Sequence, residues 1–236
     1  MRPIQMHDQG EWIAQRVEGW GRVASVAGAG FEAYVRLLHP VADHETVASS
    51  VAGDAWQACR WALVAAERGK VMHPLVQWGR FVEPPDAYAA GSSVGWLDPE
   101  VLAAMVPLLN RATSTPDDVV AGFWNGWGGS EIASPSSLTI PPGREFSLLA
   151  TSLTELADPE WGRQPEIGWA DGQRFPSVQL LWPEDHGWLV ASEIDWDSTI
   201  VAGRRSLIDD LLGDARFETF EVAAGDDLSW AGDTIN

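Results

Sequence analysis

The residues best suited to chemistry are three carboxylates spaced two positions apart and two hydroxyls that follow them directly. They are Glu193, Asp195, Asp197, Ser198 and Thr199. Alternate side chains of a β-strand point to the same face, so residues 188–197 predict a strand with one apolar face and three carboxylates on the other, about 7 Å apart. Hard oxygen ligands of this kind suit Mg²⁺ or Ca²⁺. The alternatives are a basic partner, or a solvated face neutralised by Arg204 or Arg205.

The same segment matches the Asp-x-Asp-x-Thr signature of the haloacid-dehalogenase phosphotransferases. The resemblance implies Asp195 as the nucleophile, Asp197 as the acid/base and Thr199 as the residue that closes the loop. Only 37 residues follow Thr199, however, and none is a lysine, whereas a phosphoaspartyl intermediate needs a cation to hold the phosphate. A divalent-metal-dependent hydrolase or phosphotransferase at these residues is therefore the alternative hypothesis.

Two other catalytic or metal patterns are incomplete. Residues 91–95 match the Gly-x-Ser-x-Gly nucleophile elbow around Ser93, with Asp171 and His186 downstream in the required order. The preceding residues make a poor strand and no helix follows at once, so the segment is interpreted as a Gly/Ser loop. His39 and His44, with Asp43 between them, fit no known metal-ligand spacing and are interpreted as turn residues.

Fourteen tryptophans in 236 residues is an unusually high number. Most are expected in the core, because an indole buries a large apolar surface. Tryptophans next to glycine and polar residues are the candidates for exposed binding loops, since aromatic side chains are typical interface anchors. These candidates are Trp127, Trp182 and Trp188.

The charge limits the class of partner. The chain carries 15 basic and 34 acidic residues, a net charge of −19, which repels nucleic acids and anionic membranes. Residues 1–140 contain 9 basic and 15 acidic residues, and residues 141–236 contain 6 and 19, so the second part favours a basic protein or peptide. The single cysteine, Cys59, and the absence of an apolar leader predict a cytoplasmic protein without disulfides.

Apolar periodicity predicts a mixture of helices and strands. Helices are expected over residues 54–67, 99–112 and 205–212, and from Ser152, with Asp98 and Ser152 as N-caps. Strands are expected over 33–38, 119–124, 145–150, 178–182, 188–196 and 217–222, with a hairpin turn at Asp171-Gly172. Strands and helices do not alternate strictly, which favours an α+β fold with a mixed or mainly antiparallel sheet. One domain over 1–236 is expected, with 1–140 and 141–236 as sub-lobes if it divides.

The chain also resembles a family of uncharacterised hypothetical proteins from high-GC bacteria. The resemblance lies in residues 182–188, 193–199 with Gly203, 34–40 and 126–128. It implies a cytoplasmic single-domain fold and assigns no catalytic residue, because no activity is attached to that family. With every catalytic pattern incomplete, the leading hypothesis is a non-enzymatic binding module with an acidic, tryptophan-rich surface. No cofactor is expected unless Glu193, Asp195 and Asp197 bind Mg²⁺ or Ca²⁺.

Overall fold

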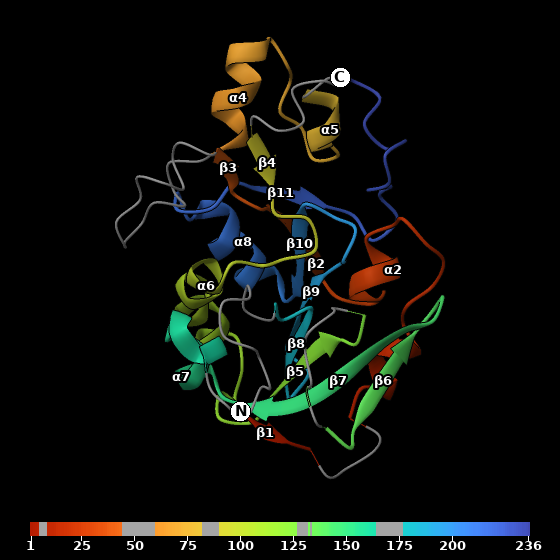
Figure 1. Ribbon diagram of the computed structural model, residues 1–236, viewed down its shortest axis with the longest axis vertical. Helices are drawn as coiled ribbons and strands as arrows, with labels where there is room; N and C mark the ends of the chain where they lie inside the picture. The colour runs from red at the N-terminus through yellow and green to blue at the C-terminus, as the bar shows by residue number, and fades with distance from the viewer. Residues whose placement is uncertain (5–8, 44–59, 82–89, 127–131, 133, 164–176) are drawn as a thin grey trace.

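The computed structural model describes residues 1–4, 9–43, 60–81, 90–126, 132, 134–163 and 177–236. Within these residues, nine strands pair antiparallel in one open sheet, in the order β1-β7-β5-β8-β9-β10-β2-β11, with β6 also paired to β7 (Figure 1). The strands are β1 (Arg2–Pro3), β2 (Ala33–Leu38), β5 (Val119–Trp124), β6 (Ser137–Ile140), β7 (Arg144–Thr151), β8 (Leu180–Pro183), β9 (Trp188–Ser192), β10 (Ser198–Gly203) and β11 (Thr219–Val222). The expected α+β fold with a mainly antiparallel sheet is confirmed.

Helices cover one face of this sheet. They are α6 (Pro99–Arg111), the single-turn α7 (Leu153–Leu156) with the 3-10 helix η3 (Pro159–Arg163), and α8 (Arg205–Gly213). Val35 and Leu37 of β2 point to this side and join a core with Leu102 of α6 and Ile208 of α8. Figure 1 shows α6, α7 and α8 together on one side of the strands.

The opposite face is covered by the short helices α1 (Glu11–Ala14) and α2 (Ala24–Ala27) and by the β6–β7 hairpin. Tyr34 of β2 and Ile200 of β10 alternate with the residues of the first face and pack here with Ile13 and Val26. Because both faces are buried, β2, β9 and β10 are buried along their whole length, as expected of central strands with two covered faces.

A smaller group of elements lies at one end of the sheet (Figure 1). It contains α4 (Trp61–Arg68), α5 (Trp78–Phe81) and the two-stranded hairpin of β3 (Val41–Asp43) with β4 (Ala90–Ser92). The rings of Trp61 and Trp78 meet edge to face with centroids 5.0 Å apart. Trp61 forms a separate small core with Leu38, at the end of β2, and with Val76. Central strand β2 therefore connects this group to the main sheet.

Most of the predicted elements occur, with two corrections. Arg60 is extended and α4 begins after it, so the helix expected over 54–67 does not run through residue 60; residues 54–59 lie outside the described part. The hairpin turn at Asp171-Gly172 lies outside it as well. Strand β10 is not among the predicted strands.

The N-cap of α6 provides a direct test of the helix prediction. The Asp98 carboxylate accepts a hydrogen bond from the amide of Glu100 at 2.8 Å. We expect Asp98→Ala to lower the free energy of unfolding by about 1 kcal/mol, because an amide of the first turn then loses its acceptor. Urea denaturation measures the loss. Asp98→Asn keeps a side-chain oxygen and is the matched control, so equal losses for both variants would contradict the capping role.

Candidate functional site

The carboxylate segment 193–197 is the loop between β9 and β10. Strand β9 ends at Ser192, and the amide of Trp196 donates to the carbonyl of Glu193 at 3.1 Å, which closes a turn. Gly95 supports the loop: its amide donates to the Trp196 carbonyl at 2.7 Å, and its φ is +68°. A Cβ at Gly95 would lie 2.3 Å from the carbonyl oxygen of Ile194. The strand expected over 188–197 is therefore wrong beyond Ser192, and the three carboxylates do not share one strand face.

Asp197 points into the protein and pairs with a buried arginine. Arg36 Nη2 lies 3.2 Å from Asp197 Oδ1, and the amide of Trp78 donates to Oδ2 at 3.3 Å. The Arg36 side chain is only 1% exposed. Its other donors reach the Ser198 hydroxyl at 2.8 Å and the carbonyls of residues 74 and 76. Burial raises the pKa of the Asp197 carboxyl, and the Arg36 guanidinium opposes that shift. Asp197 is thus a structural anchor, held by Arg36 and not by Arg204 or Arg205.

Glu193 and Asp195 are held by a different arginine, Arg144 at the start of β7. Arg144 Nη2 lies 2.6 Å from Asp195 Oδ2 and also pairs with Glu193 Oε1. The Glu193 side chain is 15% exposed and that of Asp195 is 62% exposed. Burial raises the pKa of the Glu193 carboxyl, and the positive charge of Arg144 lowers it in part. The guanidinium of Arg144 therefore forms ion pairs with two carboxylates.

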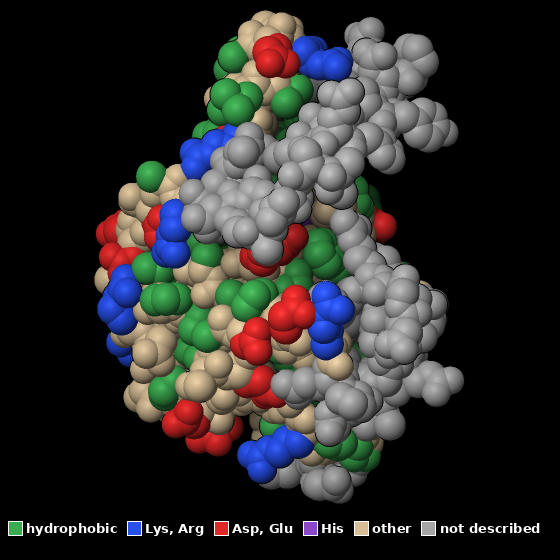
Figure 2. Space-filling view, turned by 60° about the vertical axis from the view of Figure 1, so that its left-hand side comes forward, with side chains coloured by type: hydrophobic (Ala, Val, Ile, Leu, Met, Phe, Trp, Pro, Cys, Tyr) green, Lys and Arg blue, Asp and Glu red, His purple; other side chains and the backbone are tan. Residues whose placement is uncertain are grey.

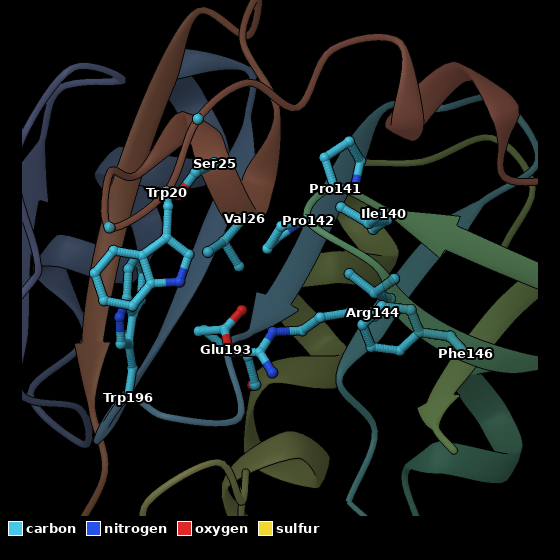
Figure 3. A pocket seen from close by; sticks show the side chains of 14 residues that line it. Trp20, Ser25, Val26, Ile140, Pro141, Pro142, Arg144, Phe146, Glu193 and Trp196 are labelled. Carbon is cyan, nitrogen blue, oxygen red and sulfur yellow. The ribbon is translucent and has the colours of Figure 1, made fainter. Parts of the chain in front are cut away.

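Arg144 and Glu193 line a pocket between α2, the β6–β7 turn and the β9–β10 loop. Its enclosed space is small, about 20 Å³. Aromatic, aliphatic and proline side chains form most of its wall, and Arg144 reaches across it to Glu193 (Figure 3). The labelled lining residues are Trp20, Ser25, Val26, Ile140, Pro141, Pro142, Arg144, Phe146, Glu193 and Trp196. We call this the Glu193 pocket.

Trp20 and Trp196 supply the aromatic part of the Glu193 pocket in different ways. Trp196 is largely buried, whereas Trp20 is 62% exposed at the edge. Both indoles line the pocket together with Glu193 (Figure 3). The site therefore combines a partly buried carboxylate, an exposed indole and one shared guanidinium.

Thr199 belongs to a buried chain of hydrogen bonds with His39 and Ser192. His39 Nδ1 lies 2.6 Å from the carbonyl oxygen of Ser93, Nε2 lies 2.8 Å from Thr199 Oγ1, and that oxygen lies 2.6 Å from Ser192 Oγ. A carbonyl oxygen only accepts, so Nδ1 carries the proton, and neutral His39 accepts at Nε2 from the Thr199 hydroxyl. Burial lowers the pKa of His39 to about 4. His39 lies in the short connection between β2 and β3, as its interpretation as a turn residue expects, and its side chain is buried.

The proposed nucleophile elbow does not assemble a triad. Residues 93–98 form a loop between β4 and α6, whereas Gly91 and Ser92 of the expected Gly/Ser loop belong to β4. A chain of hydrogen bonds through His39 and Thr199 connects Ser93 to Ser192, which is at the end of β9. His186 precedes the start of β9 and stacks on Trp12 with centroids 4.3 Å apart. Ser93 and His186 are thus at opposite ends of a strand, and Asp171 lies outside the described residues.

The predicted tryptophan surface is absent at two of its three positions. Trp182 and Trp188 are each 0% exposed. The indole nitrogen of Trp188 donates to the carbonyl of Leu109 at 3.1 Å, and Trp182 packs edge to face with Trp12. Neither can contact a partner, and Trp127 lies outside the described residues. Within those residues, Trp20 and Trp230 are the tryptophans with large exposed surfaces, at 62% and 58%.

No group of three or more His, Cys, Asp or Glu side chains in the described part of the chain is arranged to hold a metal ion. Glu193 and Asp195 face Arg144, and Asp197 faces Arg36. Divalent-cation binding at the three carboxylates would require these ion pairs to open. His44 and the side chain of Asp43 lie outside the described part.

Comparisons with protein-family models, with curated proteins and with solved structures find no match to this chain. Across the described residues, no helix combines the length and apolar character needed to span a membrane. A role for the Glu193 pocket is therefore inferred from the residues that line it.

The pocket includes residues that the sequence did not single out, chiefly Trp20 and Arg144. Trp20 stands between Gly19 and Gly21, both with positive φ, and this Gly-Trp-Gly pattern is a usable sign of an indole presented by a loop. Pro141 and Pro142 followed by Gly143 similarly indicate the turn that precedes Arg144. Nothing in the sequence indicates that these two segments meet at residue 193.

Proposed function

We propose that this protein is a non-enzymatic binding module, and that it holds a basic protein or peptide by binding one cationic side chain at the mouth of the Glu193 pocket. The observation that carries the proposal is a partly buried carboxylate next to an exposed indole. A carboxylate attracts a cation, and the face of an indole binds a cation further through its quadrupole. The module is proposed to act in the cytoplasm, where its single cysteine needs no partner.

The charge around the pocket supports a cationic ligand. Glu193 and Asp195 together contribute two negative charges, and Arg144 supplies one positive charge, so the group is left with one negative charge. The whole chain adds a net charge of −19, which steers basic partners toward it and accelerates their association. On the face seen in Figure 2, acidic side chains occur in several groups over the described surface, with arginines among them.

Trp20 supports a protein or peptide partner over a small metabolite. An indole with 62% of its surface in solvent leaves a large apolar area uncovered in the free protein. Tryptophan is among the residues that contribute most to binding at protein interfaces. A peptide side chain at the mouth of the pocket would bring the neighbouring peptide backbone over Trp20 and cover it.

The alternative, a metal-dependent hydrolase or phosphotransferase at Asp195 and Asp197, is less favoured. It requires Asp197 to leave Arg36, and a buried arginine that loses its partner is strongly destabilising. Two described cations contact these carboxylates: Arg144 already pairs with two of them, and Arg36 is buried against Asp197.

The proposal predicts that Trp20→Ala weakens binding of a basic peptide about 30-fold, since a hot-spot residue contributes about 2 kcal/mol or more. The probe is a fluorescein-labelled peptide that alternates glycine with arginine and lysine, and fluorescence anisotropy measures its dissociation constant. Added salt should weaken the binding, because exposed charges are screened.

Two controls accompany this measurement. Trp230→Ala removes an equally exposed indole that does not line the Glu193 pocket and should leave the affinity unchanged. A peptide with glutamate in place of the basic residues should not bind. Failure of the basic peptide to bind, or an equal loss for both tryptophan variants, would overturn the proposal.

A further inference from the structure

The Glu193 pocket already contains a guanidinium group, that of Arg144. Its Nη2 lies 2.6 Å from Asp195 Oδ2 and pairs with Glu193 Oε1 as well. Arg144 reaches these carboxylates from the start of β7, on the other side of the pocket (Figure 3). The protein itself thus shows which cation these two carboxylates accept.

The pairing leaves part of the hydrogen-bonding capacity of the two carboxylates unused. Both contacts of Arg144 go through the same nitrogen, whereas an arginine and one carboxylate can form two parallel hydrogen bonds. Asp195 is the more accessible of the two carboxylates, with its side chain 62% exposed against 15% for Glu193. An incoming group can therefore reach Asp195 from solvent while Glu193 stays paired with Arg144.

The aromatic residues favour a guanidinium over an ammonium group. Trp20 and Trp196 line the pocket together with Glu193 (Figure 3), and a planar guanidinium stacks on an indole face while its edge donates to a carboxylate. A guanidinium is also more weakly hydrated than an ammonium, so it loses less on binding at the mouth of a partly buried pocket.

We infer, on the basis of the function proposed above, that an arginine side chain of the partner binds at the mouth of the Glu193 pocket, and that Arg144 occupies part of its place in the free protein. The partner's guanidinium replaces Arg144 in the ion pair with Asp195 and stacks on Trp20. Arg144 remains paired with Glu193. Arg144 is then an internal competitor, which lowers the apparent affinity for the ligand.

A comparison of two peptides tests the ligand class in the unaltered protein. The probes are fluorescein-labelled peptides of one length in which glycine alternates either with arginine alone or with lysine alone. We expect the arginine peptide to bind about 10-fold more tightly. Equal binding would overturn the arginine inference and leave the basic-partner function in place, whereas no binding by either peptide would overturn both.

Replacement of Arg144 tests the competition. Arg144→Ala should bind the arginine peptide about 10-fold more tightly than the unaltered protein, because the competing charge is gone. It should also gain thermal stability in millimolar methylguanidinium, which fills the vacated place.

Arg111→Ala is the matched control, because Arg111 pairs with Asp210 on the surface with both side chains about half exposed. Methylguanidinium should not stabilise this variant. Weaker peptide binding by Arg144→Ala, or an equal response of the two variants to methylguanidinium, would overturn the competitor role of Arg144.

Discussion

Asp197→Ala is expected to lower the free energy of unfolding by about 3–5 kcal/mol, because it leaves the charge of Arg36 buried without a counter-ion. Arg36 is 1% exposed, and its other donors are already committed to Ser198 and to two backbone carbonyls. The substitution also removes the acceptor of the Trp78 amide, so the contact between α5 and the sheet loosens. Urea denaturation followed by tryptophan fluorescence measures the change.

Asp195→Ala is the control for this prediction. Asp195 belongs to the same loop, but its carboxylate is 62% exposed and its ion pair with Arg144 is in contact with solvent. Exposed ion pairs contribute about 0–1 kcal/mol, so the loss should be small. Equal losses for the two variants would show that Asp197 is not the anchor of the loop. Asp197→Asn separates charge from hydrogen bonding, since it keeps an oxygen acceptor but not the negative charge.

Local patterns in the sequence were sufficient for the elements that carry their own signals. Helix α6 follows from Asp98 as N-cap, Pro99 in the first turn and a broad apolar face. Strands β2 and β5 were predicted with their observed bounds, because both are short apolar runs with β-branched residues. The antiparallel α+β class follows from the order of such segments.

The β9–β10 loop shows where the sequence is insufficient. Residues 193–197 contain no glycine, proline or asparagine. Aspartate is also common in turns, but Asp195 and Asp197 alternate with apolar residues and so continue the pattern of β9. The chain reverses there because Gly95, from a distant segment, packs against Ile194 and Trp196. A tertiary contact, not a local preference, ends the strand.

The roles of the three carboxylates could not be read from the sequence for the same reason. Asp197 is buried because it meets Arg36, 161 residues away. Glu193, which is mostly buried, and Asp195, which is exposed, both meet Arg144, 51 residues from Asp195. One motif is thus divided between a structural ion pair and a candidate binding pocket by two arginines whose positions only the fold determines.

The stability of the protein is expected to fall as the pH decreases from about 6.5 to about 4, because of His39. Its pKa is lowered from 6.5 to about 4 by burial. Between these two values the unfolded chain binds a proton that the folded chain excludes, so stability rises with pH there and the contribution is fully present above 6.5. One such proton changes the free energy of unfolding by at most about 1.4 kcal/mol per pH unit, or about 3 kcal/mol across the window.

The hydrogen bonds of His39 give this prediction its structural reason and its control. Protonation at Nε2 would force the Thr199 hydroxyl to stop donating, while Nδ1 stays bound to the Ser93 carbonyl, in a site where His39 is 1% exposed. His39→Gln keeps a polar group without a titrating one. Urea denaturation between pH 4 and 7 should show a steeper pH dependence for the unaltered protein than for this variant, although the variant is less stable at pH 7. Parallel curves would mean that His39 is protonated in the folded protein at no cost, which its position between two fixed partners argues against.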